Sequence, residues 1–314
     1  MQLGLGTAAI GRPEYINIRA KSHEVLDLNA FKKQGFNVLE EAYKLGVRYF
    51  DTAPGYGMAE TLLLEWLQTK NDPTIIIATK WGYTYVANFN PNAKVHEVKA
   101  HSLEKLNEQW NVSKAFSSHL KVYQIHSATL ETGVLENEKV LHRLAQLKAE
   151  CNIKIGITTT GENQIEVIKK ALESHIEGEQ LFDAFQITFN VLDQSLINIS
   201  EDLIRSNKQI IIKEALANGR LFRTESYNHY RKLYNLLDEL ALKYKTTADA
   251  VLLKFCTQTI PNSIVLSGAS NGLHLLSNLK MNAITLANDD IEKLLSFKIS
   301  PSKYWDERKR LKWN

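Results

Sequence analysis

The sequence is poor in the features that mark secreted, fibrous or disordered proteins. It contains two Cys, six Pro and 15 Gly in 314 residues. Cys151 and Cys256 lie far apart with no second Cys near either, which excludes a disulfide framework and a CxxC zinc site. A hydrophobic share of 44% with 23% charged residues is ordinary for a globular protein and excludes collagen-like repeats and intrinsic disorder.

Long apolar runs and strong charge of one sign are also missing. The apolar runs span only a few residues, such as Ile75–Ala78, against the roughly 20 that a membrane span needs. The amino-terminal residues lack the pattern of a signal peptide, so we expect a cytoplasmic protein without a membrane partner. The net charge is +3 with acidic and basic residues interspersed, and only the tail from Lys303 is locally basic, so we expect no nucleic-acid partner.

Short β-rich runs alternate with amphipathic stretches along the chain. Helical spacing of apolar residues predicts helices over Phe31–Leu45 and Leu135–Ala149, Gly46 follows the first as a capping glycine often does, and Thr247 is typical of a helix start. Eight runs are predicted as strands: Leu3–Thr7, Tyr49–Ala53, Ile75–Lys80, Val122–Ser127, Lys154–Thr158, Ala184–Asn190, Gln209–Ala215 and Ser263–Gly268.

Eight successive strand–helix units predict an α/β protein with a parallel sheet. That number is typical of a closed (β/α)8 TIM barrel, and no linker divides residues 1–314, so we expect one domain. Residues 301–314 are expected to form a C-terminal tail beyond the last helix. An open doubly wound sheet is the alternative.

Ionisable side chains follow three consecutive predicted strands. Asp51, Lys80 and His126 stand at strand ends, and Tyr56 follows one short turn later. Taken singly, Asp51 is typical of a helix cap and Lys80 of a solvated lysine. His126 is typical of a core histidine, and Tyr56 of loop packing. Because the carboxyl ends of barrel strands converge on one face, we expect the four to meet.

Together these residue types suit proton transfer to a carbonyl oxygen. A lysine beside a tyrosine is expected to lower the tyrosine pKa from its ordinary value, and a carboxylate would hold that lysine charged. Tyr56 would then act as general acid and base, tuned by Lys80 and Asp51, while His126 orients the carbonyl. The sequence therefore predicts an apparatus for reducing a carbonyl group.

At these residues the chain resembles the aldo/keto reductase superfamily over essentially its whole length. The similar stretches are DTAPGYG at 51–57, Glu60, ATK at 78–80 and His126. The resemblance implies a (β/α)8 barrel that reduces an aldehyde or ketone, or oxidises an alcohol, with a nicotinamide cofactor. The family's catalytic tetrad carries over onto Asp51, Tyr56, Lys80 and His126.

The resemblance also implies where the cofactor binds, and no GxGxxG motif competes with it. Thr158, Thr159 and Gln186 correspond to the residues that hold the carboxamide, Thr159 standing where relatives have Asn. Family tendency favours NADPH over NADH, although relatives place Lys or Arg where this chain has Gly268 and His274. The expected cofactor-binding residues are Gly6, Thr7, Asp51, Thr158, Thr159, Gln186, Gly268, Ala269, Ser270, His274 and Asn278.

The chain departs from the family pattern after the seventh predicted strand. Lys213-Glu214 stands where many relatives have a Tyr that stacks on the nicotinamide, which leaves the stacking partner unassigned. Either the two residues form a structural ion pair, which we favour, or Glu214 faces the pocket.

The substrate side is predicted from the aromatic loop at 81–90. Trp81 and His126 are the expected substrate-binding residues, although the loop could instead pack on its own barrel. Tyr304, Trp305 and Trp313 could close over the mouth. Substrate identity, reaction direction and oligomeric state do not follow from the sequence.

Two other functions compete with the reductase. A catalytically quiet nicotinamide-binding barrel could serve a partner protein as a regulatory subunit. A metal-dependent hydrolase using Asp51 and His126 lacks an HxH pair or a further clustered ligand, so we expect no metal.

Overall fold

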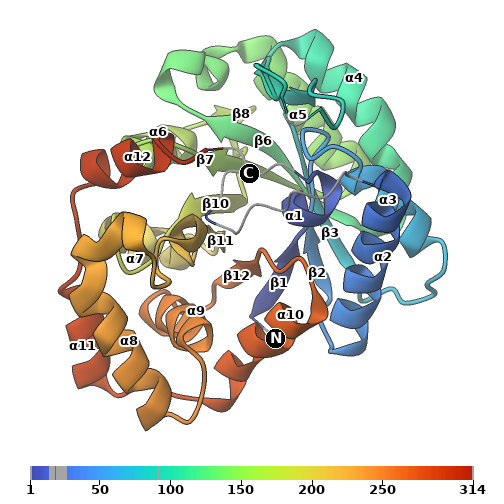
Figure 1. The fold of residues 1–314 in the computed structure, drawn as a ribbon. Coiled ribbons are helices and arrows are strands. Elements are labelled where there is room, and N and C mark those ends of the chain that lie inside the picture. Colours follow the sequence, from blue (N-terminus) through green and yellow to red (C-terminus); the bar gives the residue numbers. More distant parts are fainter. Residues whose placement is uncertain (1, 14–17, 19–26, 91, 313–314) are drawn as a thin grey trace.

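The structure is a computed structural model that describes residues 2–13, 18, 27–90 and 92–312. Eight parallel strands close into a barrel in the order β1-β12-β11-β10-β7-β6-β3-β2, and Figure 1 shows them gathered at the centre of the molecule. The barrel strands are β1 (Leu3–Gly6), β2 (Tyr49–Asp51), β3 (Ile76–Trp81), β6 (Leu120–Ala128), β7 (Lys154–Thr159), β10 (Ala184–Thr188), β11 (Gln209–Lys213) and β12 (Ile264–Ser267). All eight strands expected from the sequence are confirmed, and the open sheet is excluded.

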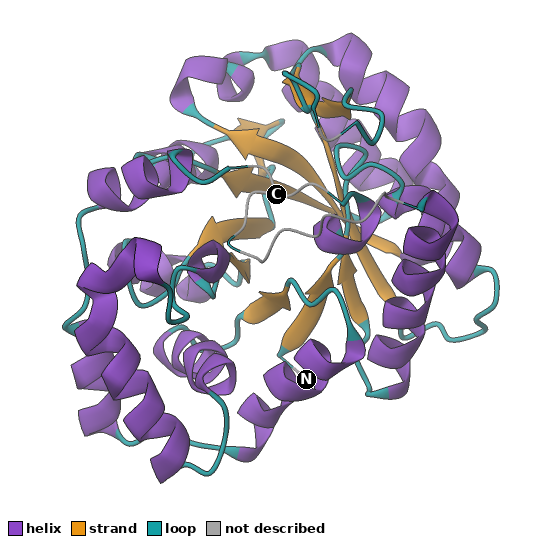
Figure 2. Ribbon diagram, viewed as in Figure 1, coloured by secondary structure: helices purple, strands orange, loops and turns teal. Residues whose placement is uncertain are grey.

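Helices surround the barrel, as Figure 2 shows. They are α1 (Ala8–Gly11), α2 (Leu28–Lys44), α3 (Ala59–Leu67), α4 (Leu103–Ser113), α5 (Glu138–Cys151), α6 (Gln164–Leu172), α7 (Ile197–Arg205), α8 (Arg231–Lys243), α9 (Ala248–Thr259), α10 (Gly272–Leu279), α11 (Asn288–Leu295) and α12 (Pro301–Lys309). Two hairpins lie outside the barrel: β4 (Tyr83–Tyr85) with β5 (Glu97–Lys99), and β8 (His175–Ile176) with β9 (Glu179–Gln180). None of the described helices is long and apolar enough to cross a bilayer.

Helix α2 illustrates how the sequence specifies these elements. The Asp27 side chain accepts hydrogen bonds from the N–H groups of Asn29 and Ala30, which caps the first turn. Val38, Leu39 and Ala42 are buried at helical spacing against the barrel. Gly46 follows with a φ of +90°, the left-handed conformation that glycine adopts without strain.

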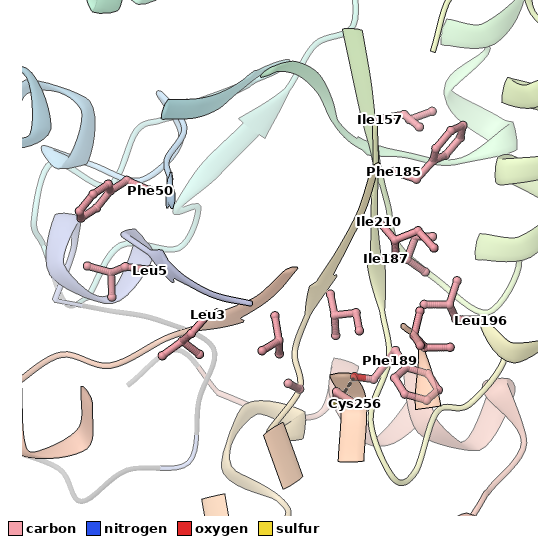
Figure 3. Close-up of a cluster of buried hydrophobic side chains, with 14 of the residues drawn as sticks. Leu3, Leu5, Phe50, Ile157, Phe185, Ile187, Phe189, Leu196, Ile210 and Cys256 are labelled. Atoms are coloured by element: carbon pink, nitrogen blue, oxygen red, sulfur yellow. Dashed lines mark hydrogen bonds between the residues drawn. The ribbon is translucent and has the colours of Figure 1, made fainter. Parts of the chain in front are cut away.

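The main hydrophobic core lies between the barrel and the helices. Figure 3 shows part of it, including Phe185, Ile187 and Phe189 from the region of β10. The ring of Phe189 stacks on Phe255 of α9 with centroids 5.7 Å apart, and the buried Cys256 thiol donates to the Phe189 carbonyl. Burial raises the pKa of Cys256, so this thiol is a packing element rather than a nucleophile.

One expectation about the carboxyl end is wrong. Residues 301–309 form helix α12 instead of a tail beyond the last helix. The Ser300 side chain accepts from the N–H of Lys303, and Pro301 stands at the start of the helix, where its missing N–H costs nothing. Buried Tyr304 and Trp305 attach α12 to the barrel.

Candidate active site

The polar site follows from the alternation of side chains along each strand. Residues two apart point to the same face, and a small apolar cluster fills one end of the barrel interior. Its members are Tyr49, Ala78, Val122, Ala184 and Ile211. Two residues further along the same strands come polar side chains: Asp51, Lys80, Gln124, Gln186 and Lys213. The barrel interior is therefore apolar at one end and polar at the carboxyl ends of the strands.

Asp51 and Lys80 form a buried ion pair in this polar layer. The Lys80 Nζ donates to Asp51 Oδ1 and to the Thr52 carbonyl oxygen, the latter at 2.9 Å. The other carboxylate oxygen of Asp51 accepts from the amides of Gln186 at 2.7 Å and Gln124 at 3.3 Å. Every charge in the cluster thus has a partner, which offsets the cost of removing it from water.

Tyr56 lies over this pair. Its hydroxyl lies 3.5 Å from His126 Nε2, and the Lys80 ammonium lies 4.7 Å from its ring centroid. Burial, with Asp51 adding to it, raises the pKa of Tyr56 well above its ordinary value. The expected lowering of this pKa by Lys80 is therefore not found, because burial dominates and Asp51 neutralises the lysine. Tyr56 is a protonated hydroxyl, ready to donate.

The turn that carries Tyr56 is fixed by two glycines. A Cβ on Gly11 would come within 2.2 Å of the Tyr56 carbonyl oxygen. Gly57 has a φ of +63°, and a Cβ there would come within 2.5 Å of the Gly11 oxygen. The Met58 N–H donates to that same oxygen at 2.8 Å. Helix α1 and the turn after β2 therefore pack backbone to backbone, which positions the tyrosine.

His126 is held as a neutral imidazole. Burial, then the positive charges of Lys80 and Arg12, lower its pKa well below the ordinary value. The ring of Tyr83 packs against it with centroids 4.7 Å apart, and His101 Nε2 lies 2.9 Å from its backbone carbonyl oxygen. Neutral His126 and protonated Tyr56 can both present a hydrogen to one acceptor atom placed between them.

A cavity of about 690 Å³ opens over these residues, a volume typical of cofactor and substrate sites. It is lined by many of the residues expected to be catalytic or to bind the cofactor: Gly6, Asp51, Tyr56, His126, Thr158, Gln186, Gly268, Ala269, Ser270, His274 and Asn278. Lys80 lies beneath it, in contact with Asp51. The structure thus brings the four residues of the predicted tetrad together at one end of a continuous cavity.

Three expected contact residues, Thr7, Thr159 and Trp81, lie outside the cavity lining. Thr7 is buried and its hydroxyl donates to the Asp51 carbonyl oxygen at 3.0 Å. Thr159 points away from the barrel interior toward Gln164, and Thr160 lines the cavity in its place. Strand alternation is the reason, since Thr158 and Thr160 share one face and Thr159 takes the other.

Trp81, expected to bind substrate, is fully buried and its indole packs on His101 with centroids 5.5 Å apart. It follows the inward-facing Lys80 and so points outward from the barrel. The aromatic residue of this loop that lines the cavity is Tyr83. Tyr85 and Phe89 pack on each other at 5.4 Å, so the loop both walls the cavity and packs on itself.

The far end of the cavity contains a hydrogen-bonded cluster. Asn278 donates to the Asp249 carboxylate at 2.6 Å and accepts from Ser267 at 2.6 Å. Gly268 and Ala269 precede α10 rather than opening it, and the Ala269 N–H donates to Ser267 Oγ at 3.2 Å. A Cβ on Gly268 would meet no atom within 4 Å, so this backbone faces open space.

Lys213 and Glu214 both line the cavity. Their charged atoms lie 4.0 Å apart, while Glu214 accepts from Arg308 at 3.2 Å and from the Tyr304 hydroxyl at 2.9 Å. Burial raises the pKa of Glu214, but Arg308 and Lys213 outweigh it and bring the pKa to about 2. The two readings of the pair are therefore both partly right: Glu214 is ion-paired, chiefly to Arg308, and it faces the cavity.

Several lining residues do not follow from the sequence pattern. Arg12, whose guanidinium lies 2.8 Å from Glu97, and Arg308 of α12 both line the cavity. No motif marks them, since they follow no strand end. Tyr304 and Trp305 pack beside the mouth as part of α12, and Trp313 lies outside the described residues. Within the described ranges, no group of three or more His, Cys, Asp or Glu is placed to hold a metal ion.

Glu60 is a buried carboxyl behind the site, and it gives a pH-dependent prediction. It accepts from Thr79 Oγ1 at 2.5 Å and Ser113 Oγ at 3.0 Å, and burial raises its pKa to about 7. Since the pKa is raised, the folded state favours the protonated form. Its stabilising contribution is full below the unfolded-state pKa of about 4.3 and is lost as pH rises through about 7.

We therefore expect Glu60→Gln to remove this pH dependence. Urea unfolding gives the free energy of unfolding of the wild type and of Glu60→Gln at each pH. The wild-type value minus the variant value should fall by at most ~3 kcal/mol as the pH rises from about 5 to about 8. Exposed Glu65 on the same helix supplies the control, and Glu65→Gln should leave the pH dependence as in the wild type. A pH-independent difference for Glu60→Gln would contradict the assignment.

Comparison with known proteins shows the family and the fold. The aldo/keto reductase family model matches residues 2–299. The uncharacterized oxidoreductase YqkF of Bacillus subtilis (strain 168) is 28% identical over 156 residues, 46% of this chain and 47% of that protein, so the match spans about half of that relative.

Solved structures share the fold. A glycerol dehydrogenase from Gluconobacter oxydans superposes with a TM-score of 0.71 at 17% identity, over 94% of this chain and 91% of that one. A mutant of Gox0644 in complex with NADPH superposes with a TM-score of 0.63 at 19% identity, over 96% and 90% of the two chains. With its family match over almost the whole length and its closed barrel, the chain belongs to the aldo/keto reductase family, whose members are NAD(P)-dependent oxidoreductases.

Proposed function

We propose that this protein reduces an aldehyde or ketone with a nicotinamide cofactor, or oxidises the corresponding alcohol, with Tyr56 as the general acid and base. The observation that carries the proposal is the pairing of Tyr56 Oη and His126 Nε2, 3.5 Å apart at the wall of the cavity. A carbonyl oxygen placed between them would accept two hydrogen bonds, which polarises the carbonyl and fixes its direction.

The residues present fit a nicotinamide cofactor. The cavity is continuous from the tetrad to the open backbone at Gly268 and the polar cluster at Asn278, which suits a long, polar, anionic molecule. Gln186 and Thr158 line it beside the tetrad, where they would hold the carboxamide. A bound NAD(P)H would supply the hydride.

The residues of the chain itself would donate and accept the proton. Tyr56 is protonated because burial raises its pKa, so it can donate to the oxygen that gains negative charge during reduction. Lys80, held by Asp51, lies beneath the tyrosine ring and would stabilise the phenolate left behind. Neutral His126 keeps the oxygen in place. In the reverse direction the same groups would remove a proton from an alcohol.

The cofactor is proposed to be NADPH in preference to NADH. Support comes from His274 and Ser270, which line the far end of the cavity and can donate to a 2′-phosphate, and from the NADPH bound by a structural neighbour. The substrate is proposed to be a small-molecule carbonyl compound or alcohol, bound beside Tyr83, Arg12 and Glu97 on the wall next to the tetrad.

The test is a broad panel of aldehydes and ketones with NADPH and with NADH, followed by loss of the reduced-cofactor absorbance, and a matching panel of alcohols with the oxidised forms. We expect turnover of at least one compound class. Failure of both panels in a protein that binds the cofactor, with a stable protein complex recovered from the native cell, would replace the proposal with the regulatory-subunit alternative.

A further inference from the structure

Lys213 is a half-buried cation at the cavity wall that the proposed proton transfer does not use. It ends β11, two residues after the inward-facing Ile211, and its side chain is only 18% exposed. Its ammonium donates to Thr188 Oγ1 at 2.8 Å and lies 5.6 Å from the Trp305 ring centroid. A buried ammonium needs compensating charge, and a hydroxyl supplies none.

The carboxylate of Glu214, next to Lys213, pairs mainly with Arg308. Glu214 lies 4.0 Å from Lys213 but 3.2 Å from Arg308. The other two carboxylates that line this end of the cavity are also paired within the described residues. The three pairs are Asp51 with Lys80, Glu97 with Arg12 and Glu214 with Arg308. Lys213 is the lining cation left outside these three pairs, and besides Glu214 the carboxylate that acts on it is the buried Asp193, which is not part of the cavity lining.

The Lys213 charge lies close enough to act on the reacting end. Lys213 is in register with Thr188 on β10, the strand that carries Gln186, whose amide reaches Asp51. The Lys213 charge is also among those that lower the pKa of His126. The hydride donor must lie within about 3–3.5 Å of a carbonyl carbon held by Tyr56 and His126. A nicotinamide ring in that position would feel the Lys213 field.

We infer that Lys213 biases the nicotinamide site toward the reduced cofactor. The inference rests on the proposed function. The oxidised and reduced cofactors share their phosphates and adenosine, but the oxidised ring carries one more positive charge. A cation beside the ring repels only the oxidised form. At the effective dielectric of a protein site this amounts to roughly a tenfold difference in affinity. Burial lowers the pKa of Lys213 while Glu214 opposes that shift.

The test compares dissociation constants of NADP⁺ and NADPH for the wild type and Lys213→Met, using fluorescence for the reduced form and calorimetry for the oxidised form. We expect the variant to gain roughly tenfold in NADP⁺ affinity relative to NADPH. Lys213→Arg keeps the charge and should keep the wild-type ratio. Lys303→Met removes an exposed lysine of α12 and matches the net charge of the variant without touching the cavity. Lys213→Gln is a second neutral variant should the methionine destabilise the fold.

A ligand without the nicotinamide ring separates a ring effect from a phosphate effect. The affinity of 2′-phospho-ADP-ribose should be the same for the wild type and Lys213→Met. An unchanged NADP⁺-to-NADPH ratio, or an equal change for 2′-phospho-ADP-ribose, would overturn the inference and leave the proposed function standing. A folded wild type that binds neither cofactor form would overturn both.

Discussion

Replacement of Tyr56 by phenylalanine is expected to lower turnover by about 10³-fold while leaving NADPH affinity nearly unchanged. The hydroxyl is the proposed proton donor, and among the described residues its hydrogen bond is the long one to His126 at 3.5 Å, so its loss costs little stability. The ring, over which the Lys80 ammonium lies, remains in place. Steady-state kinetics and fluorescence titration measure the two quantities separately.

Tyr83 provides the matched control, because it lines the same cavity and its ring also packs on His126. Burial raises its pKa to about 12, so it too is protonated, and the Lys99 ammonium lies 5.2 Å from its ring centroid. Lys99 donates to the Ser127 carbonyl oxygen, whereas Lys80 is held beneath Tyr56 by the buried Asp51 carboxylate. Tyr83→Phe should retain turnover. Activity that survives in Tyr56→Phe and disappears in Tyr83→Phe would transfer the proton-donor role to Tyr83.

Replacement of Lys80 by methionine is expected to remove turnover and to destabilise the fold by about 3–5 kcal/mol. Both members of the Lys80–Asp51 pair are buried, so the variant leaves an uncompensated carboxylate in the barrel. Gln186 and Gln124 still donate to Asp51 but carry no charge. Urea unfolding of the two proteins measures the loss.

A double variant separates stability from chemistry. Adding Asp51→Asn to Lys80→Met removes the unpaired charge and should recover most of the stability, since replacing both partners of a buried pair costs far less than removing one. Turnover should stay lost, because the Lys80 ammonium is gone and the remaining cation near the ring, Arg12 at 5.5 Å from the centroid, is paired with Glu97. A double variant as unstable as Lys80→Met would show that the pair contributes through packing rather than charge.

The fold and the proximity of the four residues of the proposed tetrad could be predicted because both depend on local patterns. The lining residues Asp51, His126, Thr158 and Gly268 stand at or near the ends of predicted β-rich runs, and strands of a parallel barrel bring those ends together. The convergence of strand ends therefore predicts that Asp51, Lys80 and His126 lie close together. In the structure Lys80 contacts Asp51, and His126 contacts Tyr56.

The errors at Thr159 and Trp81 come from neglecting strand alternation. Each is one residue beyond an inward-facing side chain, so the alternation itself indicates Thr160 and excludes Trp81. The direction of the Tyr56 pKa shift was wrong because the sequence identifies the lysine charge but not the depth of burial, which dominates.

The roles of Arg308 and Glu214 could not be predicted locally. Arg308 reaches the cavity only because α12 folds back against the end of β11, 94 residues earlier in the chain. Glu214 adopts a φ of +54°, an uncommon backbone conformation for a residue other than glycine, and the bonds from Tyr304 and Arg308 hold its side chain in place. Both depend on tertiary contacts that no spacing encodes.

The most direct measurement is a parallel fluorescence titration of the purified, folded protein with NADPH and NADH. Cofactor binding is the claim on which the proton chemistry and the role of Lys213 both depend, and it can be measured without knowing the substrate. We expect saturable binding, tighter for NADPH, with His274 and Ser270 available to its 2′-phosphate. Saturable binding of neither cofactor to the folded protein would contradict the oxidoreductase function.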